Sequence, residues 1–233
     1  MGATSSKEIE AAIMATSLPA LSTKIAVVSP HLCAVGPKRL LSKTKRQVAL
    51  ASMGASVSLR VTIRDVTNKS DDDEMFVVDG YQVLRDRDGI PLAMLVGNQL
   101  SRTFDVRDPK SNRTLLTIER VLVSGEPTAV ATFQDRIFGK RYILGYTGDW
   151  TRHHLAVFWV ASADVLKTDP AEPTDPLAPT RQPIARVYPS RKLGLDVSYC
   201  IEVAPGMDMG LVALLCFVLD YSGDNLMGSM RCP

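Results

Sequence analysis

The chain has 233 residues, of which 45% are hydrophobic and 22% are charged, and its formal net charge is +2. This composition is ordinary for a soluble globular protein and excludes a disordered, collagen-like or coiled-coil chain. Because 27 basic residues are nearly balanced by 25 acidic ones, the whole protein is not a general polyanion binder, and nucleic acid is not an expected partner.

The first residues predict a short helix over 5–16. Ser5 and Glu8 fit a capping box, and the apolar residues that follow lie on one helical face. An isolated helix of this length is marginal in water. We therefore expect residues 1–24 to be an extension of the main domain, either disordered or a short helix.

From residue 56 onward the pattern changes to a period of two, which is typical of strands. In SVSLRVTIR (56–64) apolar residues alternate with polar ones, so one face is buried and the other is solvated. Similar short segments continue to residue 161, separated by turn signals such as Asp88-Gly89 and Gly148-Asp149. The connections are too short for crossover helices, so neighbouring strands should be antiparallel.

A proline-rich segment at 168–183 interrupts this pattern. Its prolines prevent regular strand pairing, and only about fifty residues follow it, too few for a comfortable second domain. We interpret it as an exposed loop within one domain rather than as a linker. Two more strands are expected at 183–188 and 195–203.

The last predicted element is a helix that is apolar on every side. Asp208 is a good N-cap for MGLVALLCFVLDY (209–221), and Gly223 is placed to end the helix. Its eleven or so apolar residues span roughly 16 Å, about half of a hydrocarbon core, so protein must enclose it. We expect a mainly β fold: a closed antiparallel barrel of about ten to twelve strands around a central apolar C-terminal helix. This barrel domain would cover 25–223, with 224–233 as a tail.

Three stretches carry a family resemblance that covers roughly residues 25–221. They are AVVSPHLCA (26–34), the strand-turn-strand units of the kind at 83–92, and the most specific one, YCIEVAPGMD (199–208), which leads into the apolar helix. Together they resemble the LURP-one-related family of plants, with phospholipid scramblases as more distant relatives. The resemblance implies a non-enzymatic, tubby C-terminal-like barrel, phosphoinositide binding by basic residues on the barrel exterior, and a setting in plant defence or stress responses.

Enzyme and metal signals are absent from the sequence. There is no G-x-S-x-G, P-loop or H-E-x-x-H motif, so we assign no catalytic residue, metal or cofactor. The four cysteines are too sparse for a disulfide scaffold and lack zinc-site spacing. No window approaches the ~20 apolar residues of a membrane span. We expect a cytoplasmic protein, peripheral at the plasma membrane if it binds lipid.

Two basic groups are the candidates for binding lipid headgroups. At an anionic bilayer each cation that reaches the surface contributes roughly 1 kcal/mol. Alternatively, the first group is a solvated edge strand that its lysines protect from aggregation. The second group flanks a turn and would join the first only if the fold brings them together. The groups are Lys38, Arg39, Lys43, Lys45 and Arg46, and Arg136, Lys140 and Arg141.

The N-terminus MGATSS matches a myristoylation motif with Gly2 as the acceptor. One myristoyl chain binds membranes weakly, and the first basic group would supply the second signal. We expect a monomer that binds anionic phospholipids or phosphoinositides. A soluble protein-interaction scaffold without lipid affinity is the alternative, and a scramblase-like lipid-handling protein is a third hypothesis.

Overall fold

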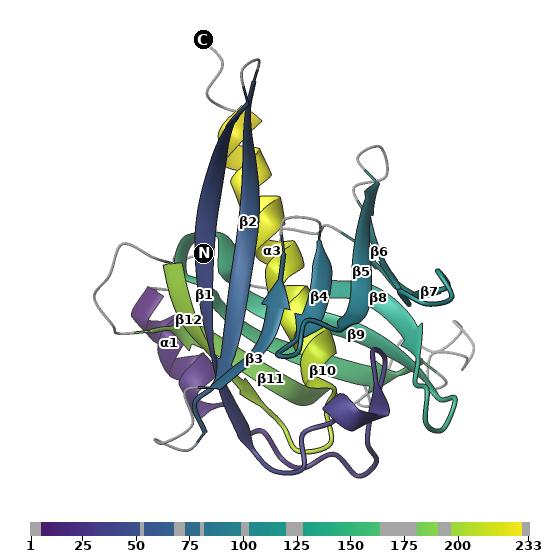
Figure 1. The fold of residues 1–233 in the computed structure, drawn as a ribbon. Helices are drawn as coiled ribbons and strands as arrows, with labels where there is room; N and C mark the ends of the chain where they lie inside the picture. Colours follow the sequence, from purple (N-terminus) through teal and green to yellow (C-terminus); the bar gives the residue numbers. More distant parts are fainter. Residues whose placement is uncertain are drawn as a thin grey trace, which may run out of the picture.

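A computed structural model describes residues 6–51, 54–67, 73–79, 82–98, 103–119, 128–163, 181–190 and 197–229. Twelve antiparallel strands form one closed barrel around a C-terminal helix (Figure 1), which confirms the predicted fold. The strands are β1 (Lys38–Ala51), β2 (Gly54–Asp65), β3 (Asp73–Val78), β4 (Val83–Asp86), β5 (Pro91–Asn98), β6 (Thr103–Arg107), β7 (Thr114–Glu119), β8 (Thr128–Gln134), β9 (Arg141–Asp149), β10 (Leu155–Ser162), β11 (Gln182–Pro189) and β12 (Val197–Val203).

Each strand pairs with its neighbours in the sequence, and β1 closes the barrel by pairing with β12 from Lys38↔Val203 to Thr44↔Val197. Closure pairs β1 on both sides over residues 38–44. Beyond Thr44 the β1–β2 hairpin continues to Ala51↔Gly54. The helices are α1 (Ser6–Ala15), the 3-10 helix η1 (Pro30–Leu32), the single turn α2 (Trp150–His153) and α3 (Met209–Ser229).

Strand alternation decides which side chains reach the lumen. In β1, Leu40 belongs to the lumen core, whereas Leu41 lies on the outer wall in contact with the side chains under α1. In β2, Val61 and Ile63 are buried in the same lumen core as Leu40. The period-two pattern of the sequence therefore maps directly onto the inner and outer faces of the barrel.

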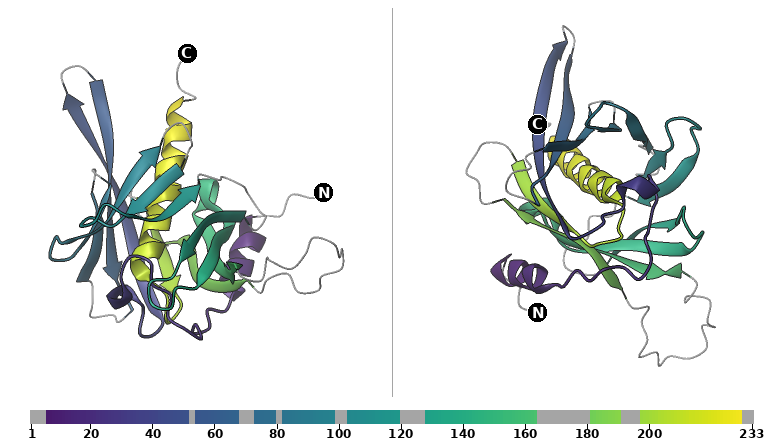
Figure 2. Two further views of the ribbon diagram at one scale, coloured as in Figure 1. Left: turned by 90° about the vertical axis from the view of Figure 1, so that its right-hand side faces the viewer. Right: turned by 60° about the horizontal axis from the view of Figure 1, so that its bottom comes forward.

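Helix α3 runs through the lumen (Figures 1 and 2). Leu211, Leu215 and Phe217 are at most 1% exposed, which confirms that protein encloses this helix. Its predicted end at Gly223 is wrong, because the helix continues to Ser229 and so extends into the predicted tail. A glycine inside a helix costs only roughly 1 kcal/mol relative to alanine and does not force the helix to stop.

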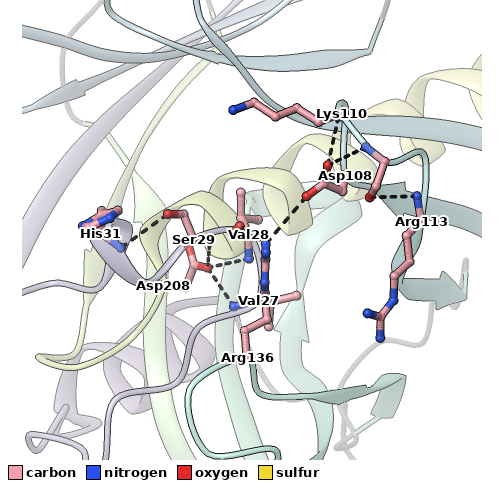
Figure 3. A network of polar contacts seen from close by, with 10 residues as sticks. Val27, Val28, Ser29, His31, Asp108, Lys110, Arg113, Arg136 and Asp208 are labelled. Carbon is pink, nitrogen blue, oxygen red and sulfur yellow. Dashed lines mark hydrogen bonds and ion pairs between the residues drawn. The ribbon is translucent and has the colours of Figure 1, made fainter.

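The segment 21–34, here called the strap, crosses the barrel end at which α3 begins (Figure 2). Asp208 joins the strap to the helix and is fully buried. One carboxylate oxygen accepts hydrogen bonds from the backbone N–H groups of Val27, Val28 and Ser29, at 2.9, 2.7 and 3.1 Å (Figure 3). The predicted N-cap is confirmed, since the other oxygen accepts from the N–H groups of Gly210 and Leu211 at 2.9 and 3.2 Å.

Burial and hydrogen bonding have opposite effects on the pKa of Asp208. Burial raises the pKa of this carboxyl, whereas hydrogen bonds from Val27, Ser29, Val28 and Leu211 favour the charged form. The carboxylate is the shared acceptor for N–H groups that water cannot reach. It therefore stabilises both the start of α3 and the path of the strap.

Helix α1 confirms the short N-terminal helix predicted from the sequence and lies on the outer wall of the barrel. Ile13 packs against Leu41, Tyr188 and other side chains of that wall. Arg186 of β11 donates hydrogen bonds to backbone carbonyls at the end of α1 and just beyond it. Tertiary packing thus stabilises a helix that would be marginal alone.

We expect Asp208→Ala to lower the free energy of unfolding by about 3 kcal/mol or more, because buried N–H groups lose their acceptor. Urea denaturation followed by tryptophan fluorescence measures the change. The matched control is Asp88→Ala, in an exposed turn, which should shift the free energy by less than about 0.5 kcal/mol. Equal midpoints for the two variants would contradict the role of Asp208.

Candidate functional site

The first predicted basic group lies in β1, and its first two cations already have partners. The ammonium of Lys38 is 2.6 Å from a carboxylate oxygen of Asp65 in β2. The guanidinium of Arg39 lies 5.9 Å from the ring centroid of Tyr188. Burial acts to raise the pKa of Asp65, but hydrogen bonds from Lys38 and Thr67 hold it below its ordinary value. These two cations therefore contribute to the barrel wall.

Lys43 lies on the outer face of β1. Its neighbour Thr44 is buried on the lumen side, where its hydroxyl is 3.4 Å from a carboxylate oxygen of Asp220 in α3. Strand alternation therefore directs Lys43, which is partly exposed, away from the lumen. Lys45 and Arg46 continue β1 beyond it, and their side chains lie outside the described part of the structure.

The second basic group is on a different part of the barrel. Arg136, Lys140 and Arg141 lie at the β8–β9 turn, and the barrel order from β1 passes β12, β11 and β10 before it reaches β9 and β8. The structure therefore does not bring the two basic groups together. Each forms a surface of its own.

The β8–β9 turn is held rigidly. Asp135 is 3% exposed, and one carboxylate oxygen accepts from the N–H of Ala26 in the strap at 2.9 Å. The other accepts from the N–H of Phe138 at 2.6 Å. Gly139 has a φ of +70°, a conformation that favours glycine, and its N–H donates to the carbonyl of Asp135. The buried carboxylate thus fixes both the shape of the turn and its position against the strap.

This turn presents apolar side chains between cations. We call residues 136–141 the basic tip. Ile137 is 37% and Phe138 is 58% exposed. Arg136 donates to the carbonyl of Val28 at 2.7 Å and lies 4.0 Å from a carboxylate oxygen of Asp108 (Figure 3). The other two cations of the tip, Lys140 and Arg141, are exposed.

Other exposed apolar side chains lie at the same end of the barrel. Because the strands alternate in direction, the β4–β5 turn opens at this end, and its Ile90 is 53% exposed. Val35, in the loop between the strap and β1, is 92% exposed. In the described part of the chain, four of the six large hydrophobic residues that are exposed lie at this end. Such a concentration is typical of an interaction surface.

A buried polar cluster surrounds Asp220 near the other end of the apolar part of α3. Its carboxylate accepts hydrogen bonds from the indole N–H of Trp150 at 3.1 Å and the hydroxyl of Tyr199 at 2.8 Å, besides the contact with Thr44. The ring of His154 contributes its Nε2 at 3.5 Å. Burial first, and then the nearby carboxylate, raise the pKa of Tyr199. These contacts join α3 to three parts of the barrel and have a structural role.

His153 and His154 are adjacent but contact different carboxylates. His153 ends α2, and its Nδ1 is 2.9 Å from a carboxylate oxygen of Asp149. His154 follows the helical turn with a φ of 50° and faces Asp220.

Two predictions from the sequence concern residues outside the described part of the structure: the acylation of Gly2 and most of the proline-rich loop at 168–183. Within the ranges that are described, no group of three or more His, Cys, Asp or Glu side chains could hold a metal ion. No helix in this same part of the chain is long and apolar enough to cross a membrane.

A closed antiparallel barrel with an apolar C-terminal helix in its lumen is the architecture of tubby C-terminal-like proteins. The sequence model of the LURP-one-related family matches residues 55–220, and the chain belongs to this family. An X-ray structure of a protein from Arabidopsis thaliana has a similar fold, with a TM-score of 0.50 at 16% sequence identity, over 84% of this chain and 96% of that one. No curated protein matches the chain.

We expect Lys38→Ala to raise the pKa of Asp65 toward its ordinary value, because the substitution removes a hydrogen bond and a neighbouring positive charge. A carboxyl whose pKa is depressed by folding stabilises the fold above its unfolded pKa and loses this effect as the pH falls through its folded pKa. The variant should therefore be less stable than the wild type at neutral pH. Below pH ~3 the free energies of unfolding of the two proteins should differ very little.

A pH titration of the carboxyl carbons by NMR measures this change. Asp105 is the internal control, because hydrogen bonds from Arg107 and Thr117 lower its pKa at a distant strand. Its titration should be the same in both proteins. An unchanged pKa of Asp65 would show that Lys38 does not stabilise the charged carboxylate.

Proposed function

We propose that this protein is a non-enzymatic, peripheral membrane protein that binds anionic phospholipid headgroups through the basic tip. Membership of the LURP-one-related family supports a tubby-like protein. The observation that carries the proposal is a rigid turn that exposes Ile137 and Phe138 between Arg136, Lys140 and Arg141.

The chemistry of the basic tip suits a membrane interface better than bulk water. Cations near an anionic surface each contribute about 1 kcal/mol. An exposed aromatic side chain gains free energy when it leaves water for the boundary between headgroups and acyl chains. Isolated exposed apolar residues are common on proteins. An adjacent pair held rigidly between cations combines both forms of attraction at one place.

The first basic group is a second, weaker candidate surface. Lys38 is paired with Asp65 and Arg39 lies over the ring of Tyr188. Of the described side chains in this group, Lys43 is the one for which neither kind of contact is seen. We further propose myristoylation of Gly2, which the N-terminal motif suggests, and a location at the inner face of the plasma membrane. The family resemblance suggests a role in defence or stress responses.

We expect the double variant Ile137→Ser/Phe138→Ser to bind anionic vesicles about fivefold or more weakly than the wild type, because two apolar side chains no longer enter the interface. Sedimentation with phosphatidylserine-containing vesicles measures the bound fraction. The control is Val96→Ser, an aliphatic residue that is 39% exposed on the barrel wall. Equal loss of binding in both variants would contradict a specific role of the tip.

Binding of the wild type should weaken as the salt concentration rises from about 50 to 500 mM, because salt screens exposed charges. Neutral vesicles should not sediment the protein. The triple variant Lys43→Ala/Lys45→Ala/Arg46→Ala separates the two basic surfaces and should retain most of the binding. If the wild type fails to sediment with anionic vesicles at low salt, lipid binding is rejected and a protein-interaction scaffold is favoured.

A further inference from the structure

The mouth of the barrel contains a pocket of about 200 Å³ beside the basic tip. The strap forms one wall, and the ends of β9, β10 and β11 form the other. Ligand sites are common in the mouths of β-barrels. The polar residues that line this pocket are Ser22, Thr23, Lys140, Tyr142, Ser162 and Gln182.

The lining chemistry is suited to an anion. It combines four hydroxyl groups, one side-chain amide and one ammonium, and among its described residues there is no carboxylate. Two other pockets differ in this respect. One is lined by four carboxylates, including Asp86 and Asp88, and the other contains Asp108 and Asp135. Only the pocket at the mouth, of these three, offers hydrogen-bond donors and a positive charge without competing negative charge.

Both walls of the pocket are fixed in place. The strap is held by hydrogen bonds from Leu21 N–H to the carbonyl of Pro205 and from Ile25 N–H to that of Gly206, at 3.0 and 2.9 Å. On the barrel side, the ring of Tyr142 stacks on Phe133 with centroids 5.7 Å apart. A ligand would therefore meet groups that are already ordered, which reduces the entropic cost of binding.

The register of the strands places two of the hydroxyl-bearing residues together. Tyr142 of β9 pairs with Ser162 of β10. Tyr142 packs against the lumen core, and Val160, two residues before Ser162, belongs to that core. Strand alternation therefore directs both Tyr142 and Ser162 to the inner side of the wall. Lys140 lies two residues before Tyr142 and within the basic tip.

We propose that this pocket binds a phosphate ester, with Lys140 as the charge partner and the hydroxyl groups as donors. The pocket is smaller than the roughly 300–1,000 Å³ of sites for drug-sized ligands, so it suits a compact phosphate with part of a polyol rather than a nucleotide. The phosphate ester can belong to a lipid headgroup or to a soluble metabolite. Binding of a lipid headgroup rests on the proposed function, because the adjacent basic tip would hold the pocket at the membrane surface.

Isothermal titration with soluble inositol 1,4,5-trisphosphate tests the pocket without a membrane. We expect binding that Lys140→Ala weakens about tenfold, since a charge-assisted hydrogen bond is lost. Tyr142→Phe removes only a hydroxyl and keeps the stacked ring, and should weaken binding about threefold. The control Lys110→Ala, an exposed lysine in the β6–β7 turn, should have no effect. Thermal unfolding of each variant verifies that it folds.

A second arm uses vesicles that contain either phosphatidylinositol 4,5-bisphosphate or phosphatidylserine at equal total charge. Preference for phosphatidylinositol 4,5-bisphosphate that is reduced in Tyr142→Phe and competed by the soluble probe supports a headgroup site. Sedimentation with both lipids alike and no binding of the soluble probe rejects the pocket but leaves the proposed function standing. Binding of the soluble probe with the expected variant pattern, but no sedimentation, rejects membrane binding and assigns the pocket to a free phosphate ester.

Discussion

The fold depends on enclosing the first part of α3, residues 209–219, which has no polar side. Such a helix cannot face water, and the barrel in turn needs a core to fill its lumen. Asp208 and Asp220 stand at the two ends of the buried part of α3, twelve positions or about 18 Å apart. Both carboxylates accept several hydrogen bonds from other elements. The helix is thus held by dispersion and burial along its length and by directional bonds at its ends.

A continuous series of contacts connects this core to the surface that we assign to binding. Asp208 holds the strap through Val27 and its neighbours, and the strap in turn donates from Ala26 to Asp135 of the β8–β9 turn. Arg136 completes the connection with a hydrogen bond from its guanidinium to the carbonyl of Val28 in the strap. The exposed side chains of the basic tip therefore rest on the same network that begins α3. A disturbance of the helix cap should reach the tip without any change in its own residues.

Local signals in the sequence were sufficient to predict the barrel and its central helix. A period of two predicts strands whose inner residues, such as Val61 and Ile63, fill the lumen. A short helix that is apolar on every side has one plausible location, and Asp208 has the chemistry of an N-cap. These inferences use neighbours a few positions apart, so they do not require knowledge of the tertiary structure.

Which side chains come together on the surface could not be predicted from such local signals. Whether Lys38 is free or paired depends on the register that brings Asp65 beside it. Whether two basic groups merge depends on strand order around the whole barrel. The partners of Asp220 come from several distant elements. One signal was present but unused: the apolar pair Ile137-Phe138 lies within a turn between cations.

The bonds between the strap and Asp208 span up to 181 positions of the chain, and this separation constrains how the protein is made. A ribosome releases the strap and β1 long before it completes α3, which both of them require. The nascent barrel therefore stays open, with an unpaired β1 edge and an empty lumen, until α3 has been synthesised. Contacts of such high sequence separation also form slowly. Until then the growing polypeptide exposes apolar strands that chaperones would protect.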